Sequence, residues 1–211
     1  MGHGSGFGKT ILFGEHFVVH GAPAIAAGLS NQAIVEVKPS DQNRIITKIF
    51  VISELSLGGI AGVLGSLEIK QKYDVHLTGD LPTYGGLGSS AAFCVALTKA
   101  FAQEKGINLT KEQVNHHAYN GEKAFHGNPS GVDNYMATYG GVAEFIRGKK
   151  QQENKFQQLT VGKPLHMVIS FSGKYSATVK MVSNVAKFKQ ENEQQFSQLM
   201  DQYLEIEQNG A

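Results

Sequence analysis

Residues 121–134 read Gly-Glu-Lys-Ala-Phe-His-Gly-Asn-Pro-Ser-Gly-Val-Asp-Asn, and the expectations for the rest of the chain are built outward from this segment. It predicts one helix that ends near Glu122 and a second that begins near Asp133, joined by a glycine-rich turn. Pro129 fixes its own φ and disfavours helix at the residue before it, and Ser130 is a natural N-cap for the second helix. The turn therefore directs two carboxylates, one suited to a divalent metal and one to a substrate hydroxyl.

Carboxylates at helix ends also have an ordinary explanation, since most of them only cap helices or face water. A glycine-rich turn, in contrast, costs backbone entropy and needs a structural or functional reason. The residues of this turn alone leave both interpretations open.

A second segment, residues 82–92, reads Pro-Thr-Tyr-Gly-Gly-Leu-Gly-Ser-Ser-Ala-Ala and predicts the start of a helix that runs to about Lys105 and ends at Gly106. The unpaired N–H groups and the positive dipole end of such a helix form an anion site, which suits polyphosphate. Ser89 and Ser90 are expected to cap the helix, and one of them is suited to Mg²⁺. A plain glycine-rich turn with a serine cap explains the same residues.

A third segment, residues 9–21, reads Lys-Thr-Ile-Leu-Phe-Gly-Glu-His-Phe-Val-Val-His-Gly. Residues 8–10 are not a P-loop, because the first glycine of that motif would fall at His3 and no strand precedes it. His16 and His20 have the spacing of a helical zinc site, but the residues between them favour a strand and no Glu follows His16.

Together, these segments resemble the motifs of mevalonate kinases, in the GHMP small-molecule kinase superfamily. Residues 9–21 and 121–134 match at the level of mevalonate kinases, and residues 82–92 contain the superfamily's Pro-x-x-x-Gly-Leu-Gly-Ser-Ser phosphate loop. Tyr84 departs from the pattern, since it stands where these kinases usually have glycine. The similarity extends from about Lys9 to Phe171, and no match to the superfamily's third glycine-rich motif follows in this chain.

The resemblance implies a role for each matching residue. Asp133 would accept or orient the proton of a substrate hydroxyl, and Lys9 would keep Asp133 ionised. Ser90 and Glu122 would hold Mg²⁺, and Glu15 and His16 would lie near the substrate. The residues that would hold the phosphates of ATP are Gly85, Gly86, Leu87, Gly88, Ser89 and Ser90.

The implied reaction is ATP-dependent phosphorylation of the C5 hydroxyl of mevalonate to give 5-phosphomevalonate. A related kinase acting on another small alcohol, such as galactose, homoserine or phosphomevalonate, would share the phosphate loop. A non-catalytic nucleotide- or isoprenoid-binding module is the alternative from a different class of protein.

Composition bounds these expectations. The chain has 211 residues, of which 41% are hydrophobic and 18% charged, and its formal net charge is +1. Such a sequence is globular and has no basic stripe for nucleic acid. No signal peptide or membrane span is expected, and the single cysteine, Cys94, lies in an apolar run; we therefore expect a soluble cytoplasmic protein.

The fold expected is α+β, with a GHMP-kinase-like N-terminal domain, a mixed or antiparallel sheet carrying helices on one face, over residues 1–155. Residues 156–211 are expected to begin a second, incomplete α+β domain. Glycines weaken a helix prediction over Leu55–Leu67, whereas residues 165–171 favour a strand. A final amphipathic helix has an apolar face that suits a core or a homodimer contact.

Overall fold

A computed structural model gives the structure of the chain. It describes residues 1–48, 53–82, 86–127, 129–148, 153–163, 166–170 and 178–210. The expectations for Tyr84, Gly85 and Asn128 lie outside these described residues. The chain forms two compact units: unit 1 contains Met1–Thr10 and Ala27–Gly141, and unit 2 contains Ile11–Ala26 and Val142–Ala211. The domain boundary at residue 155 stays a prediction.

Strands β1 (Gly2–Phe13) and β2 (Pro23–Ser40) each contribute residues to both units, and the other elements belong to one unit each. Unit 1 contains β3 (Arg44–Ile46), α1 (Glu54–Ser66), β4 (Lys72–Gly79), α2 (Ser89–Lys105), α3 (Lys111–His126) and α4 (Val132–Tyr139). Unit 2 contains the 3₁₀ helix η1 (Val18–His20), β5 (Val142–Ile146), β6 (Lys155–Leu159), α5 (Thr178–Glu191) and α6 (Glu193–Gly210).

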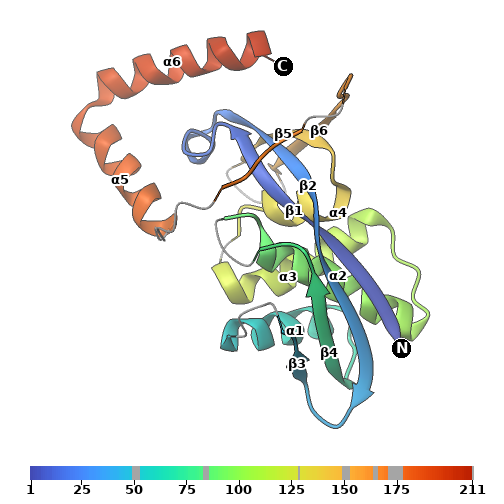
Figure 1. Cartoon of the computed structure of the whole chain (residues 1–211). Helices are drawn as coiled ribbons and strands as arrows, with labels where there is room; N and C mark the ends of the chain where they lie inside the picture. The colour runs from blue at the N-terminus through green and yellow to red at the C-terminus, as the bar shows by residue number, and fades with distance from the viewer. Residues whose placement is uncertain are drawn as a thin grey trace. The chain divides into compact units, whose positions relative to one another are not determined.

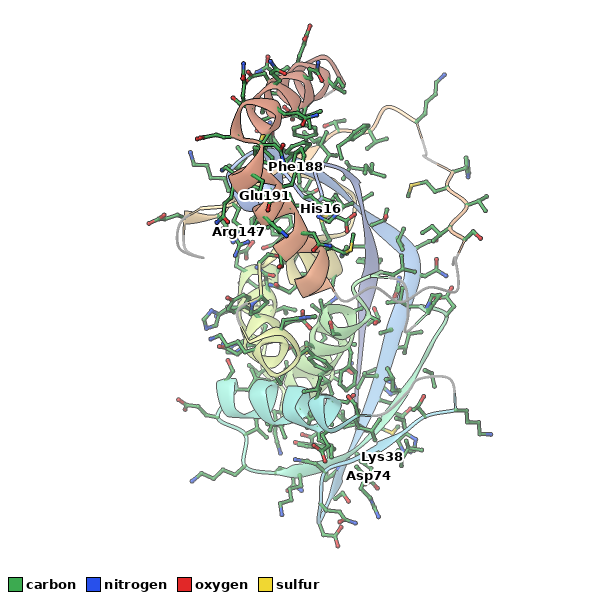
Figure 2. The ribbon with its side chains drawn as sticks, turned by 90° about the vertical axis from the view of Figure 1, so that its left-hand side faces the viewer. His16, Lys38, Asp74, Arg147, Phe188 and Glu191 are labelled. Carbon is green, nitrogen blue, oxygen red and sulfur yellow. The ribbon has the colours of Figure 1, made fainter. Side chains whose placement is uncertain are left out.

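The sheet is mixed, which confirms the α+β prediction. Its strand order is β3-β4-β2-β5-β6, with β1 paired to β2. Strands β2 and β4 run antiparallel, with Lys38 opposite Asp74, and Figure 2 labels this pair. Strand β3 joins β4 in parallel. In unit 1, α1, α2 and α3 pack on one another, and Figure 1 shows them on one face of β2, β3 and β4.

Strand β1 lies directly against the backbone of α2 because it has glycine at alternate positions. A side chain at any of these glycines would overlap a carbonyl oxygen of the helix. The pairs are Gly2 with Ala100, Gly4 with Ala96 and Gly6 with Ala92. Two residues of strand and four of helix advance by similar lengths, about 6–7 Å, so the two repeats stay in step. Nothing in the sequence analysis anticipated this contact.

Helix α1 forms where glycines argued against a helix, so that expectation was wrong. A Cβ at Gly59 would lie 2.7 Å from the Phe125 ring, and one at Gly62 would lie 2.7 Å from the Asn120 carbonyl oxygen. The glycines let α1 approach α3 closely. Burial of Ile60 and Val63 in the core of unit 1 then offsets the low helix propensity of glycine.

The glycine-rich turns begin their helices differently from the sequence expectation. The N-cap of α2 is Gly88, and the N-cap of α4 is Gly131, both with positive φ. The serine caps predicted for these helices were therefore wrong, although the Ser130 hydroxyl does accept a hydrogen bond from the Val132 N–H at 3.4 Å. Positive φ at each N-cap is a left-handed backbone conformation, which favours glycine.

In unit 2, α6 packs on residues near η1. Phe196 is buried against Phe17 and His20, and the Tyr203 hydroxyl donates to the Pro23 carbonyl oxygen at 2.7 Å. The predicted final helix is confirmed. The predicted strand over residues 165–171 is not, because His166–Ser170 adopt neither helix nor strand. Among the described residues, no helix has the length and apolar character needed to cross a membrane.

Candidate active site

The phosphate-loop segment of unit 1 sits against Lys9 of β1. The Lys9 N–H donates to the Leu87 carbonyl oxygen at 2.8 Å, and a Cβ at Gly88 would lie 2.8 Å from the Lys9 side chain. Gly86 and Gly88 both have positive φ. The backbone of the loop at Leu87 and Gly88 is therefore in contact with Lys9 at the N-terminus of α2.

Lys9 extends from β1 to the first turn of α4, where its Nζ lies 3.3 Å from Asp133 Oδ1. The lysine side chain is 9% exposed and that of Asp133 is 29% exposed. The pair is thus largely removed from water but open on one side. A carboxylate held in this way is available to a small molecule that approaches from the solvent.

Glu122, on the last turns of α3, is only 1% exposed. Burial and the charge of Asp133 raise its pKa to about 8, while the hydrogen bond from Ser90 and the charge of Lys9 act in the opposite direction. Its Oε1 has no hydrogen-bond partner among the described residues. A buried carboxyl with an unsatisfied oxygen costs free energy unless a cation or donor joins it.

Two further side chains lie beside Glu122. Ser90 Oγ, from the first turn of α2, is 3.3 Å from Nε2 of His126, and that nitrogen is 3.9 Å from Glu122 Oε2. The hydroxyl and the unsatisfied carboxylate oxygen are hard donors of the type that Mg²⁺ prefers. Within the described ranges, no group of three His, Cys, Asp or Glu side chains forms a cage for a metal. This suits an ion that takes its remaining ligands from phosphates.

The turn between α3 and α4 is held by contacts that the sequence analysis did not anticipate. The Tyr119 hydroxyl donates to the Pro129 carbonyl oxygen at 3.2 Å. The Asn134 amide donates to both the side chain and the carbonyl oxygen of Asn115, which ties the start of α4 to α3. These bonds fix the direction of Asp133. The only sequence signal for them was that Asn134 follows the predicted aspartate.

The two residues expected near the substrate belong to unit 2. Glu15 and His16 lie in the turn between β1 and η1, and Glu15 is exposed. His16, which Figure 2 labels, is half-buried. In unit 1, by contrast, the structure brings together Lys9, Asp133 and the Ser90–Glu122 pair. The roles of all these residues stay predictions.

The sequence and the fold of the chain are similar to those of known proteins. Residues 55–141 match the family model of the GHMP kinases N terminal domain. A crystal structure of L. major mevalonate kinase in complex with R-mevalonate superposes with a TM-score of 0.90 and 34% identity, over 99% of this chain and 68% of that one. The mevalonate kinase of Thermococcus sibiricus is 29% identical over 93% of this chain and 63% of its own length. That of Methanothermobacter thermautotrophicus is 32% identical over 85% of this chain and 59% of its own length.

The chain therefore belongs to the GHMP kinase family. Within that family, these relatives are mevalonate kinases. The chain spans about three fifths of the length of the curated relatives it matches.

Proposed function

We propose that the chain carries the nucleotide and catalytic half of an ATP-dependent kinase that phosphorylates the C5 hydroxyl of mevalonate to give 5-phosphomevalonate. The observation that carries the proposal is the Lys9–Asp133 pair, held beside the Ser90–Glu122 pair at the N-terminus of one helix. The similarity to a kinase solved with R-mevalonate supports this choice of substrate.

The N-terminus of α2 would bind the phosphates of ATP. The residues from Gly85 to Ser90 precede or begin this helix, and its first N–H groups have no partner within the helix. Their combined dipole favours negative charge. Ser90 and Glu122 would hold Mg²⁺, which when bound neutralises charge on the phosphates.

Asp133 would act on the substrate alcohol. Phosphoryl transfer asks the protein mainly to place the nucleophile in line with the phosphorus and to balance charge. Asp133 would orient the C5 hydroxyl or accept its proton, and Lys9 would hold the carboxylate in place and balance charge on the transferring group. The substrate role expected for Glu15 and His16 stays a prediction.

Coupled ATP consumption by this chain tests the proposal, with mevalonate, galactose and homoserine offered in parallel. We expect turnover with mevalonate alone, lost in Asp133→Asn and retained in Asp201→Asn, which changes an exposed aspartate of α6. Full activity of Asp133→Asn would contradict the assignment. Nucleotide binding without turnover on any alcohol would favour the non-catalytic binding module instead.

The proposed partners are thus ATP and mevalonate. A homodimer and a cytoplasmic location also stay proposals. Size-exclusion chromatography with light scattering tests the first, and cell fractionation tests the second.

A further inference from the structure

His126 occupies a place that the proposed reaction does not use. It is the last residue of α3, which Gly127 ends with positive φ, and it lies one turn beyond Glu122 on the same face of the helix. Its side chain is about half exposed, and its Nε2 lies 3.3 Å from Ser90 Oγ and 3.9 Å from Glu122 Oε2. Two helices therefore bring a nitrogen and two oxygens together.

The buried carboxyl of Glu122, with one oxygen unpartnered among the described residues, favours a cation among these three atoms. Glu122 is buried, and its other carboxylate oxygen has no partner in the described part of the chain. The ammonium of Lys9 lies 3.3 Å from Asp133, so it already forms an ion pair there. The separations of 3.3 and 3.9 Å are also below about 4.2 Å, the greatest distance between two ligands of one ion with bonds of about 2.1 Å.

We propose that His126 is a third protein ligand of this cation site and raises its affinity for Mn²⁺ relative to Mg²⁺. The inference rests on the proposed function, because Ser90 and Glu122 are the other two ligands. Mg²⁺ prefers oxygen ligands, whereas imidazole nitrogen suits transition-metal ions, whose affinity for nitrogen donors increases along the first row. An imidazole beside a hydroxyl and a carboxylate shifts the site toward Mn²⁺ without excluding Mg²⁺.

Pulsed electron paramagnetic resonance of bound Mn²⁺ tests the proposal directly. The chain is loaded with Mn²⁺ and inorganic tripolyphosphate, a ligand that contains no nitrogen. We expect ¹⁴N modulation with the coupling of a directly bound imidazole, present in the wild type and lost in His126→Gln. The matched control is His116→Gln, an exposed histidine of the same helix, which should keep the modulation.

Competition between Mn²⁺ and Mg²⁺ gives a second readout. His126→Gln should lower the ratio of Mn²⁺ to Mg²⁺ affinity by about tenfold, because it leaves only oxygen-type ligands. Mn²⁺ binding without imidazole modulation, or an unchanged ratio, would overturn the role of His126 and leave the proposed function standing. Failure of the wild type to bind Mn²⁺ with tripolyphosphate would overturn the cation site, and with it the proposed function.

Discussion

Among the residues that the structure describes, one glutamate is buried in each unit. Glu122 in unit 1 is 1% exposed, and Glu207 in unit 2 is 7% exposed. Burial is the largest cause of a raised pKa at both. The surroundings differ: Glu122 has Ser90 and Lys9 acting to keep it charged, whereas Glu207 shares a hydrogen bond with a second carboxyl, that of Glu144.

The difference separates two ways of accommodating a buried acid. A carboxyl that shares a proton with another carboxyl removes one charge from the interior and needs no further partner. Glu122 has donors around it, yet one oxygen stays unsatisfied, so its surroundings suit a positive ligand. A buried acid group therefore indicates a binding site where one of its oxygens is left without a hydrogen-bond partner.

The largest expected effect comes from removing the Lys9 ammonium, the positive group beside Asp133 and Glu122 in unit 1. Lys9→Met should lower turnover with mevalonate by about 10²–10³-fold, because Lys9 is proposed to balance charge on the transferring phosphoryl group. Steady-state kinetics measures this loss. Lys187→Met, which removes an exposed lysine of α5 that pairs with Glu191, should leave turnover unchanged. An equal loss in both variants would mean that Lys9 is not specific to the reaction.

A smaller effect is expected on the affinity for Mg·ATP, in which the two glutamates should differ. Glu122→Gln should weaken binding of Mg·ATP by about 10–100-fold, since an amide is a poorer ligand for Mg²⁺ than a carboxylate. Glu207→Gln should change that affinity by less than about twofold, because Glu207 has no proposed role in the site. Calorimetry at matched Mg²⁺ concentration measures both. Equal losses would show that Glu122 is not a ligand.

The dependence of stability on pH sharpens the comparison further. Both folded-state pKa values are raised, so the unfolded chain loses these protons first as the pH rises above the ordinary glutamate value of 4.5. The free energy of unfolding should therefore fall with increasing pH, until about pH 8 for Glu122. At pH 7.5 Glu122→Gln should be more stable than the wild type by on the order of 1 kcal/mol, and the stability of Glu207→Gln should change in the same direction.

Urea unfolding at several pH values measures this slope, and Glu122→Gln should flatten it more than Glu207→Gln. A wild type whose stability rises between pH 5 and pH 7.5, with both Gln variants following the same curve, would contradict the raised pKa values.

The smallest effect concerns the exposed side of the helix that contains Glu207. Leu199 of α6 is 40% exposed, unlike buried Phe196 on the preceding turn. Leu199→Ser should change the free energy of unfolding by no more than about 0.5 kcal/mol. Chemical denaturation measures it, with Phe196→Ser as the contrasting variant that should lose far more. A large loss in Leu199→Ser would mean that another surface covers this position.

Local sequence signals mark the end of α2 and the start of α3. Gly106 ends α2 with positive φ, and Thr110 with Gln113 forms the capping box that begins α3. These signals act within one turn of the chain, so they work before any tertiary contact exists. The residue types of the motifs and their spacing along the chain likewise indicated the family.

Packing decided what local rules could not. Glycine lowers helix propensity wherever it stands, yet in α1 Gly59 and Gly62 permit a close helix contact, and in β1 Gly4 permits contact with α2. A propensity describes one residue and its neighbours along the chain. The benefit of a missing side chain depends on a surface contributed by residues far away in the sequence.

The candidate site divides in the same way. Its residue types and their order could be read from the sequence, including Lys9, Ser90, Glu122 and Asp133. The unsatisfied oxygen of Glu122 and the approach of His126 could not, because they depend on how α2 and α3 pack. Sequence by itself determined the chemical groups available to this protein. Only the tertiary structure decided which of them lie together and how deeply they are buried, since distance and desolvation set electrostatic energy.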